Sequence, residues 1–335
     1  MPVRESMRAA RGFRGRSRAR ARFGKMIRYS LAILCALLPI VGTADAGADP
    51  RLKGRPFDSE RAYRYLLRQC EFGYRVPGTA AHEECAQWLE QELSSRADRM
   101  TVDRFKVKVG DTRLPLANIV ATFNPKGERH ILLCAHWDTR PTADRDSDPA
   151  DRKKPILGAN DGASGVAVLL EIARALKVHP PKQRVTIVLF DGEDYGHTPT
   201  DMFLGSRAFA ERYSGPPVDW GVLLDMVGDR DLRLPYEEYS VKKAPATVER
   251  IWGAAGRAGS KAFVSKPGPP ILDDHVFLLR KGIPCVNVID FDYPYWHTRA
   301  DTPDKCSPDS LGQVGRAVLR AIAEDEAGWQ SSEVR

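Results

Sequence analysis

Val185-Thr-Ile-Val-Leu-Phe-Asp-Gly-Glu-Asp-Tyr-Gly196 is the stretch of sequence that decides the fold. Its first six residues are apolar or β-branched without polar alternation, a pattern typical of a strand buried on both faces of a parallel sheet. The run ends abruptly in three acidic residues, Asp191, Glu193 and Asp194. Ligands of open α/β sheets bind outside the carboxyl ends of the strands, so these acids lie where chemistry is expected. A solvated Asp-Gly turn would give the same local pattern, and only the rest of the chain separates the two interpretations.

Similar apolar segments alternate with amphipathic helices along most of the chain. Apolar strands are predicted at 129–135, 220–224 and 283–289, and more polar strands at 100–109 and 116–123. Helices are predicted at 58–69, 79–93, 162–176, 206–212, 246–258, 273–280 and 307–327. Strands that alternate with helices predict a single α/β domain, in which helices flank a doubly wound, mostly parallel central sheet.

The first 48 of the 335 residues differ from the rest in composition. A basic segment, a short apolar run at 30–42 and small residues up to Ala48 match a secretory signal peptide. We therefore expect residues 1–48 to be a signal peptide, and residues 49–335 to be a domain exported to the periplasm or the cell exterior. An uncleaved anchor is the alternative, although the apolar run is short for spanning a bilayer.

The excess of basic residues also belongs to this leader. It holds ten of the 51 basic residues and two of the 44 acidic ones, so the remaining chain is close to neutral. The sequence thus gives no evidence for a nucleic-acid partner, and after cleavage none for a membrane. Cys70 and Cys85 flank a short loop between predicted helices and are the best candidates for a disulfide in an exported chain. Cys134 and Cys285 lie in apolar strands and are expected to be buried thiols.

Acidic and histidine residues recur where the predicted strands end. His136 and Asp138 follow one apolar strand, Asp225 follows another, and Asp161 and His297 lie in loops on the same side. Each alone has a common structural explanation, such as a turn, a helix cap or a hydrogen-bonded histidine. Together they share one edge of the sheet, because the carboxyl ends of parallel strands lie side by side, and we expect them to converge.

Two histidines and several carboxylates are ligands that Zn²⁺ accepts, and a catalytic zinc site leaves one position open. Asp138 is placed to hold the imidazole of His136 from behind the metal. The neighbouring acids Glu193 and Asp194 suggest divided roles, in which one carboxylate binds metal and the other transfers protons. The remaining histidines have structural interpretations. We expect His275 to be structural, and solvent exposure for His82, His130, His179 and His197.

In this order the motifs resemble the M28 family of zinc aminopeptidases and their relatives. They are His136-x-Asp138, Asn160-Asp161-Gly162, Asp191-Gly-Glu-Asp194, Leu223-Leu-Asp225 and His297-Thr298, within roughly residues 58–325. The resemblance implies that Glu193 is the general acid/base. It implies zinc ligands at His136, Asp161, Asp194, Asp225 and His297, with Asp161 as the bridging carboxylate if two ions bind.

The C-terminal third is most similar to the animal-type glutaminyl-peptide cyclotransferases, through Asp273-Asp-His275 and Trp296-His297. That resemblance implies conversion of an N-terminal glutamine to pyroglutamate with release of ammonia. It also implies that Asp273 belongs to a catalytic hydrogen-bond relay and that Trp296 lines the substrate pocket. One zinc ion would then be held by Asp161, Asp194 and His297, while His136 and Asp225 form hydrogen bonds.

The chain departs from the cyclase pattern at four places, one of which is the disulfide beside the His-x-Asp strand of the animal enzymes, since 162–168 holds no partner for Cys134. Asp194 stands where the cyclases usually have Glu, Asn287 lies near a position where they have His, and 196–199 lacks their Trp. The alternative function is therefore an exported M28 aminopeptidase that uses two zinc ions to hydrolyse N-terminal residues. Peptide or protein N-termini are the expected substrates in both cases. A silent binding domain with the same fold is disfavoured, because Glu193 and the whole ligand set are present.

Overall fold

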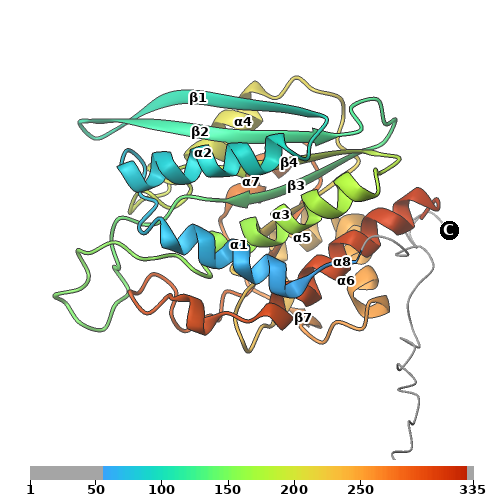
Figure 1. Ribbon diagram of the computed structural model, residues 1–335. Helices are drawn as coiled ribbons and strands as arrows, with labels where there is room; N and C mark the ends of the chain where they lie inside the picture. The colour runs from blue at the N-terminus through green and yellow to red at the C-terminus, as the bar shows by residue number, and fades with distance from the viewer. Residues whose placement is uncertain (1–55, 330–335) are drawn as a thin grey trace, which may run out of the picture. The chain divides into compact units, whose positions relative to one another are not determined.

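A six-stranded sheet with the strand order β1-β2-β4-β3-β5-β8 lies at the centre of the structure, a computed structural model that describes residues 56–329 (Figure 1). Four adjacent strands are parallel, namely β4 (Arg184–Phe190), β3 (His130–His136), β5 (Trp220–Asp225) and β8 (Cys285–Ile289). The expected signal peptide, residues 1–48, lies outside the described residues.

The strand β4, which contains the apolar run from Val185 to Phe190, lies inside the sheet and every residue of that run is buried. It pairs in parallel with β3 on one side. On the other side it pairs antiparallel with β2 (Thr112–Phe123), and β1 (Arg99–Val109) pairs antiparallel with β2. The prediction of a buried strand in a mostly parallel sheet is confirmed, with β4 at the boundary between parallel and antiparallel pairing.

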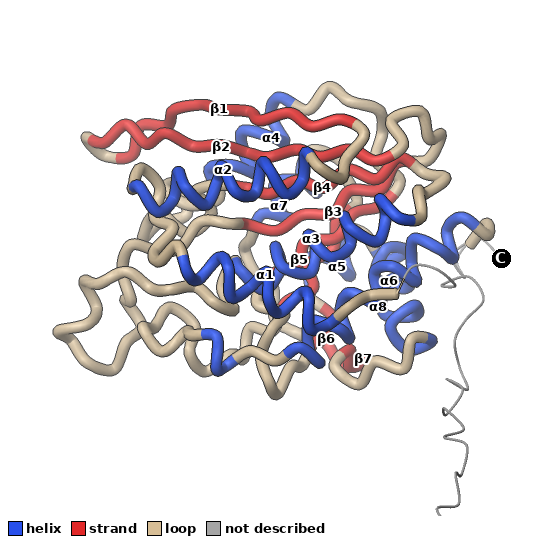
Figure 2. Tube along the Cα trace, in the orientation of Figure 1, coloured by secondary structure: helices blue, strands red, loops and turns tan. Residues whose placement is uncertain are grey.

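Helices cover both faces of the sheet, as expected for a doubly wound arrangement (Figure 2). One face carries the larger apolar core and the helices α1 (Ser59–Glu71), α2 (Ala80–Ser94), α3 (Ala163–Val178) and α8 (Pro308–Glu326), with α6 (Pro245–Arg257) against α8. The other face carries a smaller core under α4 (Leu204–Arg212) and α7 (Asp274–Arg280). None of the described helices combines the length and the apolar character that crossing a membrane requires.

The ends of several helices follow from their capping residues. Asp58, Thr79 and Ser307 accept hydrogen bonds from the backbone N–H groups of Arg61, His82 and Ser310. Such side chains satisfy N–H groups that have no partner within the first turn of a helix. The predicted helix starts near these positions are confirmed.

Four short elements were not predicted from the sequence. They are β6 (Leu234–Tyr236), α5 (Glu238–Lys243), β7 (Phe263–Pro267) and the 3₁₀ helix η2 (Pro303–Lys305). Three to six residues carry too little periodicity to identify an element. The strands β6 and β7 form a separate parallel pair, and α5 directly follows β6.

The expected disulfide between Cys70 and Cys85 is wrong. All five cysteines among the described residues have free thiols, and Cys85 is fully buried in the apolar core. Burial raises the pKa of both Cys70 and Cys85 to about 12, so neither is an activated thiol. Cys134 and Cys285 are buried thiols, as predicted.

The expectation that His82 and His130 lie in solvent is also wrong, because both side chains are buried. The ring of His82 stacks on that of Trp137, and its Nε2 atom lies 2.8 Å from Oδ1 of Asp191. The other carboxylate oxygen of Asp191 accepts the backbone N–H of Ala117 at 2.7 Å. Asp191 is therefore no solvated turn residue, and it ties the end of β4 to α2 and β2.

Candidate metal centre and active site

The predicted site residues meet at the carboxyl ends of the parallel strands. His136 is the last residue of β3 and Asp225 the last of β5, while Glu193 follows β4 by three residues. Asp161 lies just before α3, and His297 lies in the loop that follows β8. All five side chains are buried, and the distances between them show that this edge of the sheet brings them together.

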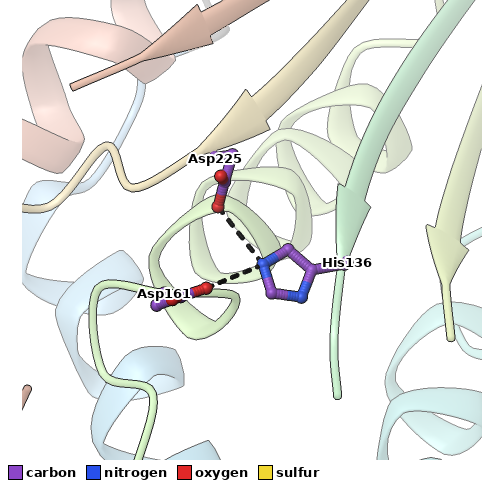
Figure 3. A group of neighbouring side chains, drawn as sticks. All are labelled: His136, Asp161 and Asp225. Carbon is purple, nitrogen blue, oxygen red and sulfur yellow. Dashed lines mark hydrogen bonds and ion pairs between the residues drawn. The ribbon is translucent and has the colours of Figure 1, made fainter. Parts of the chain in front are cut away.

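Two groups of possible metal ligands occur in the part of the chain that the structure describes, and they share Asp161. In the first group, Nε2 of His136 lies 3.2 Å from Oδ1 of Asp161 and 3.2 Å from Oδ1 of Asp225 (Figure 3). In the second group, Nε2 of His297 lies 3.3 Å from Oδ1 of Asp194 and 3.7 Å from Oδ2 of Asp161. Within each group one atom from every residue lies within 4.8 Å of the others, close enough to hold one ion.

The chemistry of these residues fits a divalent cation. The buried atoms Oδ2 of Asp161 and Oδ2 of Asp194 accept no hydrogen bond from any described residue. A buried carboxylate oxygen without a partner is costly, and a coordinated metal ion relieves that cost. Imidazole nitrogen and carboxylate oxygen together are typical zinc ligands.

The electrostatics of the site likewise favour positive charge. Burial alone lowers the pKa of a histidine, but at His136 contacts with the surrounding carboxylates outweigh burial and raise the pKa well above its usual value. In the same way, Asp194 and Asp144 raise the pKa of His297 to about 9. Both histidines thus lie in a negative field that a bound cation would neutralise.

Asp138 lies beside the imidazole of His136, as the sequence suggested, and it also holds the backbone of the acidic pair. Its Oδ1 atom lies 3.6 Å from Nδ1 of His136, which is longer than a hydrogen bond. Its carboxylate also accepts the backbone N–H groups of Glu193 at 3.0 Å and Asp194 at 3.2 Å. Asp138 therefore positions the acidic pair and also lies at ion-pair distance from the imidazole.

Asp301 holds the backbone of the segment that carries Asp161. Its role was not predicted from the sequence. Its carboxylate accepts the backbone N–H groups of Asn160 at 2.9 Å and Asp161 at 3.1 Å, and the hydroxyl of Tyr293 at 2.7 Å. The spacing of Asp301 four residues after His297 was the only available signal. Two buried carboxylates, Asp138 and Asp301, therefore fix the backbone of both acidic loops.

Arg140 supports the second ligand group. Its Nη1 atom donates to Oδ1 of Asp194 at 2.6 Å and to the carbonyl of Gly196 at 2.8 Å, while Nε donates to Oδ1 of Asp144 at 2.6 Å. Asp144 in turn lies 3.4 Å from Nδ1 of His297. Arg140 thus occupies one oxygen of Asp194 and leaves Oδ2 for a metal ion.

The long segment 139–158 is held against the loop that contains His297. The backbone N–H of Arg145 donates to the carbonyl of His297 at 3.2 Å, and that of Arg299 donates to Oδ2 of Asp146 at 3.0 Å. The guanidinium of Arg145 also lies over the ring of Trp296, 5.1 Å from its centre. The segment therefore packs against the loop that carries Trp296 and His297.

A cavity of about 290 Å³ opens beside both ligand groups. Glu193, Asp273 and Trp296 line it together with residues of both groups. Burial raises the pKa of Glu193 well above its usual value, which suits a group that must both accept and release a proton. Burial and the nearby Asp225 raise the pKa of Asp273 to about 6.

Asp273 and Trp296 are each fixed from behind the cavity. Oδ2 of Asp273 accepts a hydrogen bond from Nδ2 of Asn287 at 2.6 Å, and its other oxygen accepts the N–H of Asp274. Asn287 thus supplies a hydrogen-bond donor at one of the positions where the sequence departs from the cyclase pattern. The ring of Trp296 lies 4.0 Å from that of His297 and 4.9 Å from that of Phe291.

Gly162 is required where α3 approaches the ligands. Its φ of 91° is one that other residues rarely adopt, and a Cβ atom there would lie 2.9 Å from Cε1 of His136. We expect Gly162→Ala to lower metal affinity by about tenfold or more, because it displaces His136 and the adjacent Asp161. Metal retained after dialysis against a chelator measures the effect.

Gly73→Ala is the matched control for this substitution. Gly73 has a φ of 87°, and a Cβ atom there would meet nothing within 4 Å. The control shares the backbone strain, about 1 kcal/mol or more, but leaves the site untouched. Equal metal retention in the two variants would contradict the assigned role of Gly162.

The sequence of this chain is similar to those of known proteins. The sequence profile of Peptidase family M28 matches residues 118–322. The Bos taurus glutaminyl-peptide cyclotransferase-like protein is 26% identical over 322 residues, which cover 85% of this chain and 80% of the relative.

Two crystal structures show the same similarity in three dimensions. Tannerella forsythia glutaminyl cyclase is 39% identical with a TM-score of 0.77, and the match covers 80% of this chain and 99% of that one. A Zn-dependent exopeptidase from Parabacteroides distasonis is 36% identical with a TM-score of 0.78, and the match covers 80% of this chain and 98% of that one.

Proposed function

The chain belongs to peptidase family M28 and is a glutaminyl cyclase-like enzyme, and from this premise we propose that it is a zinc-dependent glutaminyl-peptide cyclotransferase. Its substrate would be a peptide or protein with N-terminal glutamine, which it would convert to pyroglutamate with release of ammonia. The main support for this proposal is a single cavity. It is lined by the proposed catalytic residues Glu193 and Asp273 and by the ligand group of Asp161, Asp194 and His297.

The proposed reaction needs an activated carbonyl and a group that moves protons. A zinc ion held by Asp161, Asp194 and His297 would supply a Lewis acid for the side-chain amide carbonyl of the substrate. Glu193 accepts a proton from the α-amine as its nitrogen bonds to the carbonyl carbon and closes the five-membered ring. The bond from that carbon to the amide nitrogen then breaks, and Glu193 returns the proton to the departing ammonia.

Asp273 and Trp296 complete the proposed site. Asp273, whose pKa is raised to about 6 by burial and the nearby Asp225, would stabilise the shared proton or the tetrahedral centre. Trp296, packed on His297 and lining the cavity, limits the space beside the metal group to a small side chain. Asp273 and Trp296 would both act by holding the reacting atoms of the substrate in place.

One observation favours a second candidate, an M28 aminopeptidase with two zinc ions. His136, Asp161 and Asp225 form another group that could hold an ion, and Asp161 belongs to both groups. In that enzyme Glu193 would take a proton from a water molecule, and the products would be a free amino acid and a shortened peptide.

Assaying purified protein on two peptides that differ only in their first residue separates the two functions. We expect the Gln-initiated peptide to lose ammonia without shortening, and the Leu-initiated peptide to remain intact. The same Gln peptide with an acetylated α-amine is the control, because its nitrogen cannot close the ring. Mass spectrometry and an ammonia assay give the result. Release of free amino acid from either peptide, without ammonia loss, would overturn the cyclase proposal in favour of the peptidase.

A further inference from the structure

Glu237 is a buried carboxylate that lies outside the proposed site and collects five hydrogen bonds. Oε1 accepts the backbone N–H groups of Tyr239 at 2.8 Å and Ile271 at 3.0 Å. Oε2 accepts the N–H of Ser240 at 2.6 Å and its hydroxyl at 2.7 Å, and lies 3.1 Å from Nε2 of His275. Two of these bonds cap the short helix α5, but those to Ile271 and His275 reach a distant part of the chain.

The bond to Ile271 supports one wall of the cavity. Ile271, Leu272 and Asp273 all line the cavity, and the segment that carries them rests on the turn that contains Glu237. The N–H of Gly268 donates to the carbonyl of Tyr236 at 2.7 Å, which anchors the start of this segment. No regular element contains residues 268–273, so hydrogen bonds such as the one that the N–H of Ile271 donates to Glu237 help to hold this wall in place.

A second branch leads from Glu237 to Asp273. The hydroxyl of Ser240 donates to Glu237 and accepts the backbone N–H of Asn287 at 2.9 Å. Nδ2 of the same Asn287 then holds Oδ2 of Asp273 at 2.6 Å. His275 adds a third connection, because it lies in the first turn of α7, the helix that Asp273 caps.

We propose that Glu237 is a positioning residue that sets both the substrate-facing wall at Ile271 and the orientation of Asp273. It does not line the cavity, and it acts through the bond from Ile271, through Ser240 and Asn287, and through His275. Burial raises the pKa of Glu237, but the bonds from His275 and from backbone N–H groups outweigh burial and lower the pKa to about 2. The carboxylate is therefore ionised at neutral pH, and hydrogen bonds to an ionised acceptor are stronger than those to a neutral one.

The test compares Glu237→Ala with Glu238→Ala. Glu238 is the neighbouring acid, but its side chain is exposed and pairs with Lys242, so it is a matched control. In terms of the proposed cyclase reaction, on which this part of the inference rests, we expect Glu237→Ala to raise KM for a Gln peptide about tenfold and to lower kcat. The control should keep both constants. Kinetics equal to those of the control would overturn the proposal.

Ser240→Ala separates the two branches and serves if Glu237→Ala does not fold. It removes the hydroxyl that connects Glu237 to Asn287 but leaves the bond from Ile271 to Glu237 in place. We expect a several-fold lower kcat with KM close to that of the wild type, a split that general destabilisation would not produce. An increase in KM with unchanged kcat would contradict the assignment of the branches.

Hydrogen exchange tests the same inference without any activity assay. We expect the amides of 268–273 to exchange faster in Glu237→Ala than in Glu238→Ala, because the N–H of Ile271 loses its acceptor. Unchanged exchange in this segment would overturn the positioning role. If the wild type releases no ammonia from Gln peptides, the cyclase function fails, while the exchange result still decides the role of Glu237.

Discussion

Glu193→Gln is expected to lower kcat by about 10³-fold while the protein keeps its full metal content. The amide retains the shape of the side chain but cannot accept the proton of the attacking amine, and proton transfer of this kind contributes about 10²–10⁴-fold. Glu193 belongs to neither ligand group, so its replacement leaves the metal ligands in place. Steady-state kinetics and metal analysis of the same preparation check both parts.

The pH dependence of the wild type gives a second view of Glu193. A general base must be ionised, so activity falls as the pH drops through its pKa. Because burial raises that pKa, we expect the acidic limb of the kcat/KM profile to lie above the range of an ordinary glutamate. The limb should disappear in Glu193→Gln. Near-normal turnover in this variant would refute the acid/base role.

Asp161→Ala is expected to abolish metal binding, because Asp161 is the only residue that both ligand groups share. The matched variant is Asp225→Ala, which removes a carboxylate from the His136 group alone. We expect Asp225→Ala to retain the ion held by Asp161, Asp194 and His297. Zinc stoichiometry by mass spectrometry under native conditions measures the difference.

The zinc stoichiometry of these two variants also shows how many ions the enzyme needs. If one ion suffices, as proposed for the cyclase, the stoichiometry of Asp225→Ala should equal that of the wild type. A fall from two ions to one would favour the aminopeptidase. Wild-type zinc affinity in Asp161→Ala would contradict the shared-ligand arrangement. Thermal unfolding of both metal-free variants is the control, because it separates loss of a ligand from loss of the fold.

Local patterns were sufficient to predict the sheet and the position of the candidate site. The run from Val185 to Phe190 and the helix caps at Asp58 and Thr79 depend on neighbours a few residues away, and such signals are strong in a single sequence. The convergence of His136 and Asp225 followed from strand direction alone.

Contacts between distant segments could not be predicted in this way. Asp138 and Asp301 each hold the backbone of another loop, and nothing in their own sequence neighbourhood shows which N–H groups they meet. His82 and Asp191 lie 109 residues apart, so the buried pair they form has no local signature. Glu237 sits in a turn between two elements that are themselves too short to predict.

Asp138 and Asp301 accept backbone N–H groups, and this affects which substitutions the site can tolerate. They determine where the acidic loops run without regard to the side chains that those loops present. A longer or shorter acid at position 194 would therefore leave the path of the main chain unchanged, because Asp138 holds the backbone N–H group there.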